Sequence, residues 1–100
     1  MTCRLTREAE GDLFEIFLHG LEVFGLATAE AYRDKIRHSL AIIGDNPEIA
    51  SLKAGLSPPV RVHPVGVHVI VYHLGDDGVP VILRVRSARE NWVDAPVGDA

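Results

Sequence analysis

Residues 60–92 read VRVHPVGVHVIVYHLGDDGVPVILRVRSARENW, and this stretch decides the fold. It divides into three runs rich in β-branched residues, separated by Gly66 and by the turn sequence Gly75-Asp76-Asp77-Gly78. Short apolar runs bounded by such turns are typical of β-strands joined in sequence. We therefore predict three sequential strands that pair with one another in a small sheet.

Side chains alternate between the two faces of a strand, so each run predicts which residues share a face. In the last run the odd positions are all apolar, while the even positions end in Arg84 and Arg86. The middle run, residues 67–74, is apolar on both faces, which is typical of a central strand. The first run places Arg61 and His63 on the same face. We expect Arg61, Arg84 and Arg86 to share one face of the sheet.

Two amphipathic helices precede these strands. The first follows Thr6, a candidate N-cap, and ends near Gly25. The second follows Thr28 and stops at Gly44-Asp45-Asn46-Pro47, because glycine suits the left-handed position after a helix and proline cannot continue one. The short connection predicts an antiparallel hairpin. The residues expected to face the core are Ala9, Leu13, Ile16, Phe17, Gly20, Val23 and Phe24, then Tyr32, Ile36, Leu40 and Ile43.

Together with a candidate edge strand at residues 2–5, the element order is β-α-α-β-β-β, and we also expect a helical turn at residues 48–52. This order predicts an α+β domain in which the hairpin packs on one face of a small, mostly antiparallel sheet. The other face then has no cover from this chain. With Ile70, Tyr72 and Ile82 among its expected residents, that face is predicted to bind a partner.

Length and composition fit a single domain over residues 1–92, followed by a tail, residues 93–100, that we expect to be flexible. The lone Cys3 cannot form an internal disulfide, and we expect a cytoplasmic protein. No apolar run is long enough for a membrane helix, and the N-terminus lacks the pattern of a signal peptide.

Charge is distributed unevenly along the chain, whose formal net charge is −4. Residues 7–45 hold four basic and eight acidic residues, whereas residues 60–89 hold four arginines against Asp76 and Asp77. The overall negative charge argues against a protein that binds nucleic acid over its whole surface. An anionic partner should therefore meet the sheet rather than the helices.

Patterns that would indicate catalysis or metal binding are weak. His63, His68 and His73 are five residues apart, which puts successive members on opposite strand faces, so they should not converge on zinc. No serine lies in a glycine-rich nucleophile turn, and no glycine loop could cradle a phosphate. We expect no cofactor, no metal and no covalent catalysis.

Four segments, taken together, resemble the ParE branch of the RelE/ParE toxin superfamily, and the resemblance runs from about residue 3 to Trp92. They are the opening LTREAEGDL at residues 5–13, the helix stop at residues 44–47, the strand pair VRVHPVGVHVIVY at residues 60–72, and the close from ILRV at residues 82–85 to RENW at residues 89–92. Their order and spacing carry the resemblance more than any single motif does.

The resemblance implies the toxin of a bacterial type II toxin-antitoxin pair. Toxins of the ParE type poison DNA gyrase and block replication, and a ParD-like antitoxin neutralises them with a flexible C-terminal segment. An apolar sheet face rimmed with arginines is suited to an acidic amphipathic segment that folds on binding, in a hetero-oligomer. The residues expected to bind target or antitoxin are Arg61, His63, Tyr72, Ile82, Arg84, Arg86, Arg89 and Trp92.

Other functions stay open at this point. RelE-like toxins cut mRNA on the ribosome; here Arg84 and Arg86 would stabilise the reacting phosphate and His63 or Glu48 would act as base, although Trp92 stands near the end without the usual terminal Tyr or His. The chain could also be an inert interaction module, or its acidic hairpin could contact the target. For Arg61 and Arg84 a purely structural role is an alternative, and for Trp92 an anchoring of the C-terminus.

Overall fold

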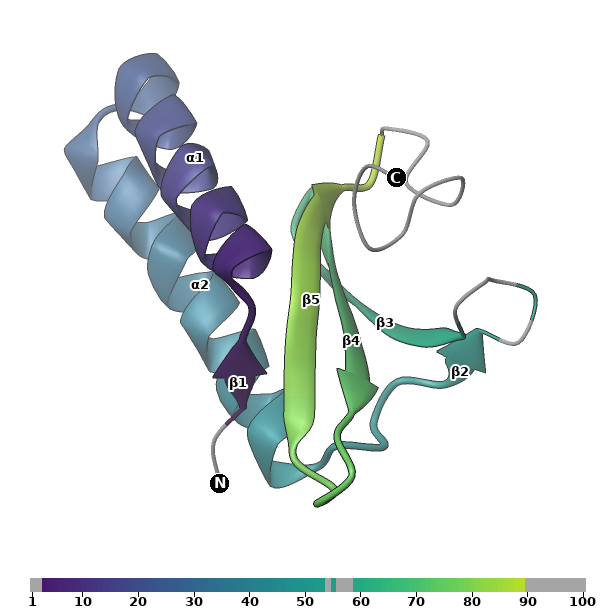
Figure 1. Cartoon of the computed structure of the whole chain (residues 1–100). Coiled ribbons are helices and arrows are strands. Elements are labelled where there is room, and N and C mark those ends of the chain that lie inside the picture. Colours follow the sequence, from purple (N-terminus) through teal and green to yellow (C-terminus); the bar gives the residue numbers. More distant parts are fainter. Residues whose placement is uncertain (1–2, 54, 56–58, 90–100) are drawn as a thin grey trace.

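A computed structural model describes residues 3–53, 55 and 59–89 and confirms the α+β architecture (Figure 1). A five-stranded sheet has the strand order β1-β5-β4-β3-β2, in which β1 runs parallel to β5 and the other neighbours are antiparallel. The elements are β1 (Arg4–Leu5), α1 (Arg7–Phe24), α2 (Leu26–Asp45), β2 (Leu52–Lys53), β3 (Val60–Val65), β4 (His68–Leu74) and β5 (Pro80–Ser87).

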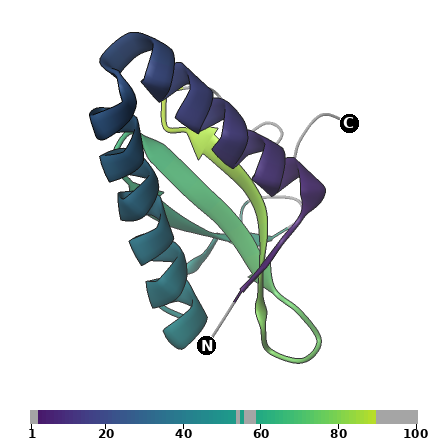
Figure 2. The same cartoon turned by 90° about the vertical axis from the view of Figure 1, so that its left-hand side faces the viewer.

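The two helices meet at Gly25 and lie on the same side of the sheet, splaying apart from their junction (Figure 2). Thr6 caps α1 as predicted, because its hydroxyl accepts a hydrogen bond from the Ala9 amide. Gly25 ends α1 and at once caps α2; its φ of 91° lies in a region that favours glycine. The predicted cap at Thr28 is therefore wrong. Gly44 is also not a left-handed terminator, since it lies buried within α2.

The main core lies between the hairpin and the sheet. The inward positions predicted for α2, including Ile36 and Ile43, pack there against Ile70, Tyr72 and Ile82. These three sheet residues are fully buried. The expectation that they line a bare sheet face is therefore wrong, because they lie on the face that the helices cover.

A β-bulge in β5 explains the error. Tyr72 pairs with Ile82 while Val71 pairs with Arg84, so Leu83 is an extra residue that opposes no partner of its own. Strict alternation predicts that Ile82 and Arg84 share a face. The additional residue shifts the second half of β5, which places Ile82 and Val85 in the helix-facing core instead.

The sheet face turned away from the helices carries a second, smaller apolar cluster. Val60, Val69 and Val71 are its buried members, and Val62 and Leu83 pack against them. This rear cluster is aliphatic, and Ile70, Tyr72 and Ile82, the residues predicted for the free face, do not belong to it. The helical turn expected at residues 48–52 is also absent, since turns and bends lead there into β2.

Candidate functional site

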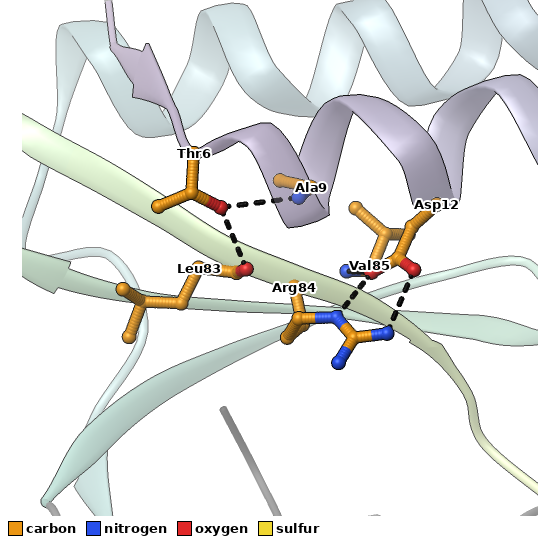
Figure 3. Close-up of polar contacts among 6 residues, drawn as sticks. All are labelled: Thr6, Ala9, Asp12, Leu83, Arg84 and Val85. Carbon is orange, nitrogen blue, oxygen red and sulfur yellow. Dashed lines mark hydrogen bonds and ion pairs between the residues drawn. The ribbon is translucent and has the colours of Figure 1, made fainter. Parts of the chain in front are cut away.

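Arg84 is held by the first helix. Its Nε and Nη2 donate to the two carboxylate oxygens of Asp12 on α1, at 2.7 and 2.9 Å (Figure 3). The Asp12 carboxylate also accepts the Val85 amide at 2.9 Å. The side chains of Arg84 and Asp12 are only 20% and 17% exposed. This arginine therefore serves to attach α1 to the open edge of β5.

The same edge is also attached through Thr6, just beyond the end of β1. Its amide donates to the Ile82 carbonyl, and its hydroxyl donates to the Leu83 carbonyl at 2.9 Å (Figure 3). The side chains of Thr6 and Asp12 thus form hydrogen bonds with backbone groups of β5 beyond the point where the two-residue strand β1 ends. The bulge and the N-terminus of α1 form one connected unit.

Arg61 and Tyr72 hold the loop that follows α2. Arg61 donates to the Ala50 carbonyl at 2.7 Å, and the Tyr72 hydroxyl donates to the Pro47 carbonyl at 2.8 Å. Burial raises the pKa of Tyr72, and the Ala50 amide and the charge of Arg61 partly offset this rise. These predicted binding residues lie inside the described fold and support it.

The predicted site residues do not share a face. Arg61 and His63 pair with Tyr72 and Ile70 of the helix-facing core, whereas Arg86 pairs with Val69 of the rear cluster. The prediction that Arg61, Arg84 and Arg86 share one face of the sheet is therefore wrong. Arg89 is exposed beyond the end of β5, and Trp92 lies outside the described residues.

The structure instead reveals a groove of about 940 Å³ between the hairpin and one end of the sheet. Apolar residues of both helices line it, and the β3–β4 turn and the end of β5 close its sheet side. Phe14 and Phe24 in this lining are 63% and 66% exposed. Large apolar side chains left open in one concave surface are typical of a binding site.

Tyr32 builds the sheet end of the groove. Its hydroxyl lies 3.1 Å from the Val65 carbonyl and 2.7 Å from Nδ1 of His68, and it accepts the Val67 amide at 3.2 Å. A side chain at Gly66 would approach the ring to 2.6 Å, which explains the need for glycine at this turn. Burial raises the pKa of Tyr32, partly offset by the bond from Val67. α2 and the β3–β4 turn are therefore fixed to each other.

The charged residues of the groove are mostly basic. Arg33, Arg37 and Arg89 line it, against Glu15 as the acidic member among the described residues. The guanidinium of Arg33 lies over the Phe17 ring, 5.1 Å from its centre. In a chain with a net charge of −4, the groove is a local concentration of positive charge on an apolar surface.

The sequence did not indicate this groove, because the binding surface was expected on the uncovered face of the sheet. The apolar stripe of α1 includes Phe17 and Phe24, but it was assigned wholly to the core. The available signal is Phe14, which falls outside the predicted stripe and is too large an apolar residue to leave unpartnered without a reason.

The described part of the chain contains no candidate metal-binding cluster and no helix suited to span a membrane. No group of three or more His, Cys, Asp and Glu side chains among residues 3–53, 55 and 59–89 could hold a metal ion. Within the same ranges, neither helix combines the length and the apolar content that crossing a membrane requires.

The fold and the groove define a small α+β domain that presents an apolar, arginine-rimmed surface between a helical hairpin and a sheet. The chain belongs to the family of ParE toxins of type II toxin-antitoxin systems (parDE), whose model matches residues 3–92. A solved structure titled "Chromosomal ParDE TA system from P. aeruginosa" has the same fold, with a TM-score of 0.75 and 20% sequence identity. The alignment covers 87% of this chain and 95% of that chain. No curated protein matches the chain.

Proposed function

We propose that this ParE toxin inhibits DNA gyrase and so blocks replication, and that a ParD-like antitoxin neutralises it by binding in the groove. The site of action would then be the cytoplasm. The groove, with exposed aromatic side chains on its walls and arginines at its rim, carries the antitoxin part of the proposal, and membership in the ParE toxin family supports the toxin part.

An acidic amphipathic segment fits this surface physically. Burial of apolar area contributes roughly 25 cal/mol per Å², and part of this offsets the entropy of ordering a flexible segment. Arg89 at the rim attracts carboxylates and discriminates against basic segments. Membership in a toxin-antitoxin family supports a ParD-type partner.

The groove and the rear face are separate surfaces, which allows a division of roles. We assign Arg89, which lines the groove, to the antitoxin, and Arg86, which lies opposite Val69 on the rear face, to the target. Arg89→Ala should then weaken antitoxin binding, and Arg86→Ala should weaken inhibition of gyrase. Titration of each variant with the antitoxin, beside a supercoiling assay, separates the two effects.

Induction of the chain in a bacterial host tests the toxin activity. We expect growth arrest, and the purified protein should inhibit supercoiling by gyrase and increase the amount of cleaved DNA. Unchanged gyrase reactions together with cleavage of ribosome-bound mRNA would refute the proposed target. Normal growth on induction would refute toxicity as such.

Two adjacent residues of α1 give a matched test of the groove. Phe24 lines it, whereas Val23, which is 56% exposed, does not. Phe24→Asp removes an apolar contact and places a negative charge where the acidic antitoxin segment would bind. Co-expressed antitoxin should therefore no longer restore growth. Val23→Asp should be rescued as well as the wild type. Equal rescue of both variants would contradict binding in the groove.

The geometry gives the RNA-cleaving alternative no support. Arg84 is occupied by Asp12, and His63 lies on the helix-facing side of the sheet while Arg86 lies on the rear side. General acid and base groups must converge on one phosphate within hydrogen-bonding distance. Arg84, Arg86 and His63 do not converge, and the other candidate base, Glu48, is exposed in the turn that follows α2.

A further inference from the structure

Arg33 has an unusual position in the groove. Its guanidinium is held over the Phe17 ring, and its side chain is 39% exposed. Among the described residues, the acidic side chain that pairs with it is Glu30, one turn earlier in α2, at 3.7 Å from Nη2. An exposed pair at this distance contributes little to binding or stability.

The Nε atom of Arg33 is buried and has no hydrogen-bond partner among the described residues. A buried donor without a partner is energetically unfavourable and is uncommon in native proteins. Arg84 shows the contrasting case in the same chain, because its Nε and Nη2 both donate to the carboxylate of Asp12. In Arg33, by contrast, Nε has no acceptor among the described residues, and Nη2 faces the Glu30 carboxylate only at 3.7 Å, which is longer than a hydrogen bond.

We propose that Arg33 determines which segment the groove accepts, by receiving a carboxylate of the bound partner on its Nε and Nη2. This inference rests on the proposed function, in which the partner is a helical antitoxin segment. A carboxylate matches the two parallel donors of a guanidinium, and such a bidentate pair is stronger and more directional than a contact with a single charge.

The surroundings of Arg33 favour an acidic peptide over other anions. The groove wall beside it is apolar and aromatic, which suits the apolar face of a helix better than a hydrated phosphate backbone. Because more than a third of the side chain is open, a rotation about its outer torsions brings both donors to a bound carboxylate. Before binding, the guanidinium lies over the Phe17 ring on the groove wall, so this rotation starts from within the groove.

A displayed library of amphipathic helical peptides, selected on the purified full chain, supplies the probe. We expect the selected peptides to share an Asp or Glu at one position. The consensus peptide is then synthesised with Glu and with Gln there, and both are titrated against the wild type, Arg33→Met, Arg33→Lys and Arg37→Met. Arg37 is the matched control, since it lines the same groove from the same helix.

The Glu to Gln change should weaken binding to the wild type and to Arg37→Met about tenfold or more. It should alter binding to Arg33→Met by less than about twofold, and Arg33→Lys should fall between, because lysine keeps the charge without the two parallel donors. Thermal melts confirm that each variant is folded before titration.

Equal Glu to Gln effects in the wild type and Arg33→Met would overturn the proposal. So would a wild-type selection without a shared acidic position, or one that yields no binder. Growth arrest on induction reports on the proposed function separately. If the chain is toxic but the Glu to Gln effect is the same in the wild type and in Arg33→Met, only the role of Arg33 is refuted. If the chain is harmless but the Glu to Gln effect is lost in Arg33→Met, the toxin activity is refuted and carboxylate recognition by Arg33 stands.

Discussion

Replacement of Asp12 by alanine tests the connection between α1 and the sheet. The Asp12 carboxylate accepts Nε and Nη2 of Arg84 and the amide of Val85, so one substitution removes three hydrogen bonds. It leaves a largely buried guanidinium without its counter-charge and a strand amide without its acceptor. The other side of β5 stays paired with β4.

The size of the effect follows from these contacts. Breaking a buried ion pair from one side costs about 3 to 5 kcal/mol, and a hydrogen bond to a charged group contributes about 1.5 to 3 kcal/mol. The two side chains retain 20% and 17% exposure, so solvent reduces this cost. We expect Asp12→Ala to lower the free energy of unfolding by about 2 to 4 kcal/mol, a large part of the stability of a small domain.

Equilibrium unfolding in urea measures this change. With an m-value of about 2 kcal/mol/M, the midpoint should fall by roughly 1 to 2 M. Glu15→Ala is the control: the same helix loses an exposed carboxylate, and the expected change is within about 0.5 kcal/mol. In a cycle with Arg84→Met, the coupling should be at least about 1.5 kcal/mol. A loss below about 1 kcal/mol, or no coupling, would refute the reasoning.

Three further predictions concern single residues. Gly66→Ala should lower the free energy of unfolding by about 2 to 4 kcal/mol, because φ is +57° and the new methyl group meets Tyr32. The control, Gly78→Ala, has a φ of +80° but open space around the new methyl group, so it should cost only about 1 to 2 kcal/mol. Thermal melts compare the two variants. Tyr72→Phe should cost about 1 to 2 kcal/mol in urea and should also flatten the loss of wild-type stability above pH 10.0, since burial raises the folded-state pKa of this tyrosine above that ordinary value. Asp77 should titrate by NMR with a pKa of about 2 rather than 3.8, because the Arg4 guanidinium on β1 donates hydrogen bonds to its carboxylate. The small contribution of this pair to stability is present above pH 3.8 and is lost as the pH falls through about 2. An Asp77 pKa that does not change when Arg4 is replaced would contradict the assigned cause.

Features set by neighbours in the sequence were predictable. The cap at Thr6, the break at Gly25 and the inward stripe that includes Ile36 and Ile43 depend on contacts within a few residues. The same holds for the turn at Gly66. These features define the helical hairpin and the sequential strands, and through them the fold class.

Features that depend on pairing between distant segments were not predictable in the same way. The bulge at Leu83 inserts one residue into β5 without a glycine or proline to mark it, and it separates Ile82 from Arg84, which regular alternation places on one face. The Arg84 contact spans 72 positions along the chain. Alternation identifies a strand well, but it assigns faces only when the strand is regular.

The arginines show what the sequence leaves undecided and why the groove matters. Arg61 and Arg84 have acceptors inside the fold, whereas Arg33, Arg37 and Arg89 line the groove, and nothing in the sequence distinguishes the two sets. An apolar groove on a free protein invites non-specific association. Charges at its rim keep the surface hydrated in the absence of a partner and repel a second copy, which carries the same rim. In the complex proposed above, the same charges would strengthen the attraction for an acidic segment, so one arrangement would serve both the free toxin and its complex.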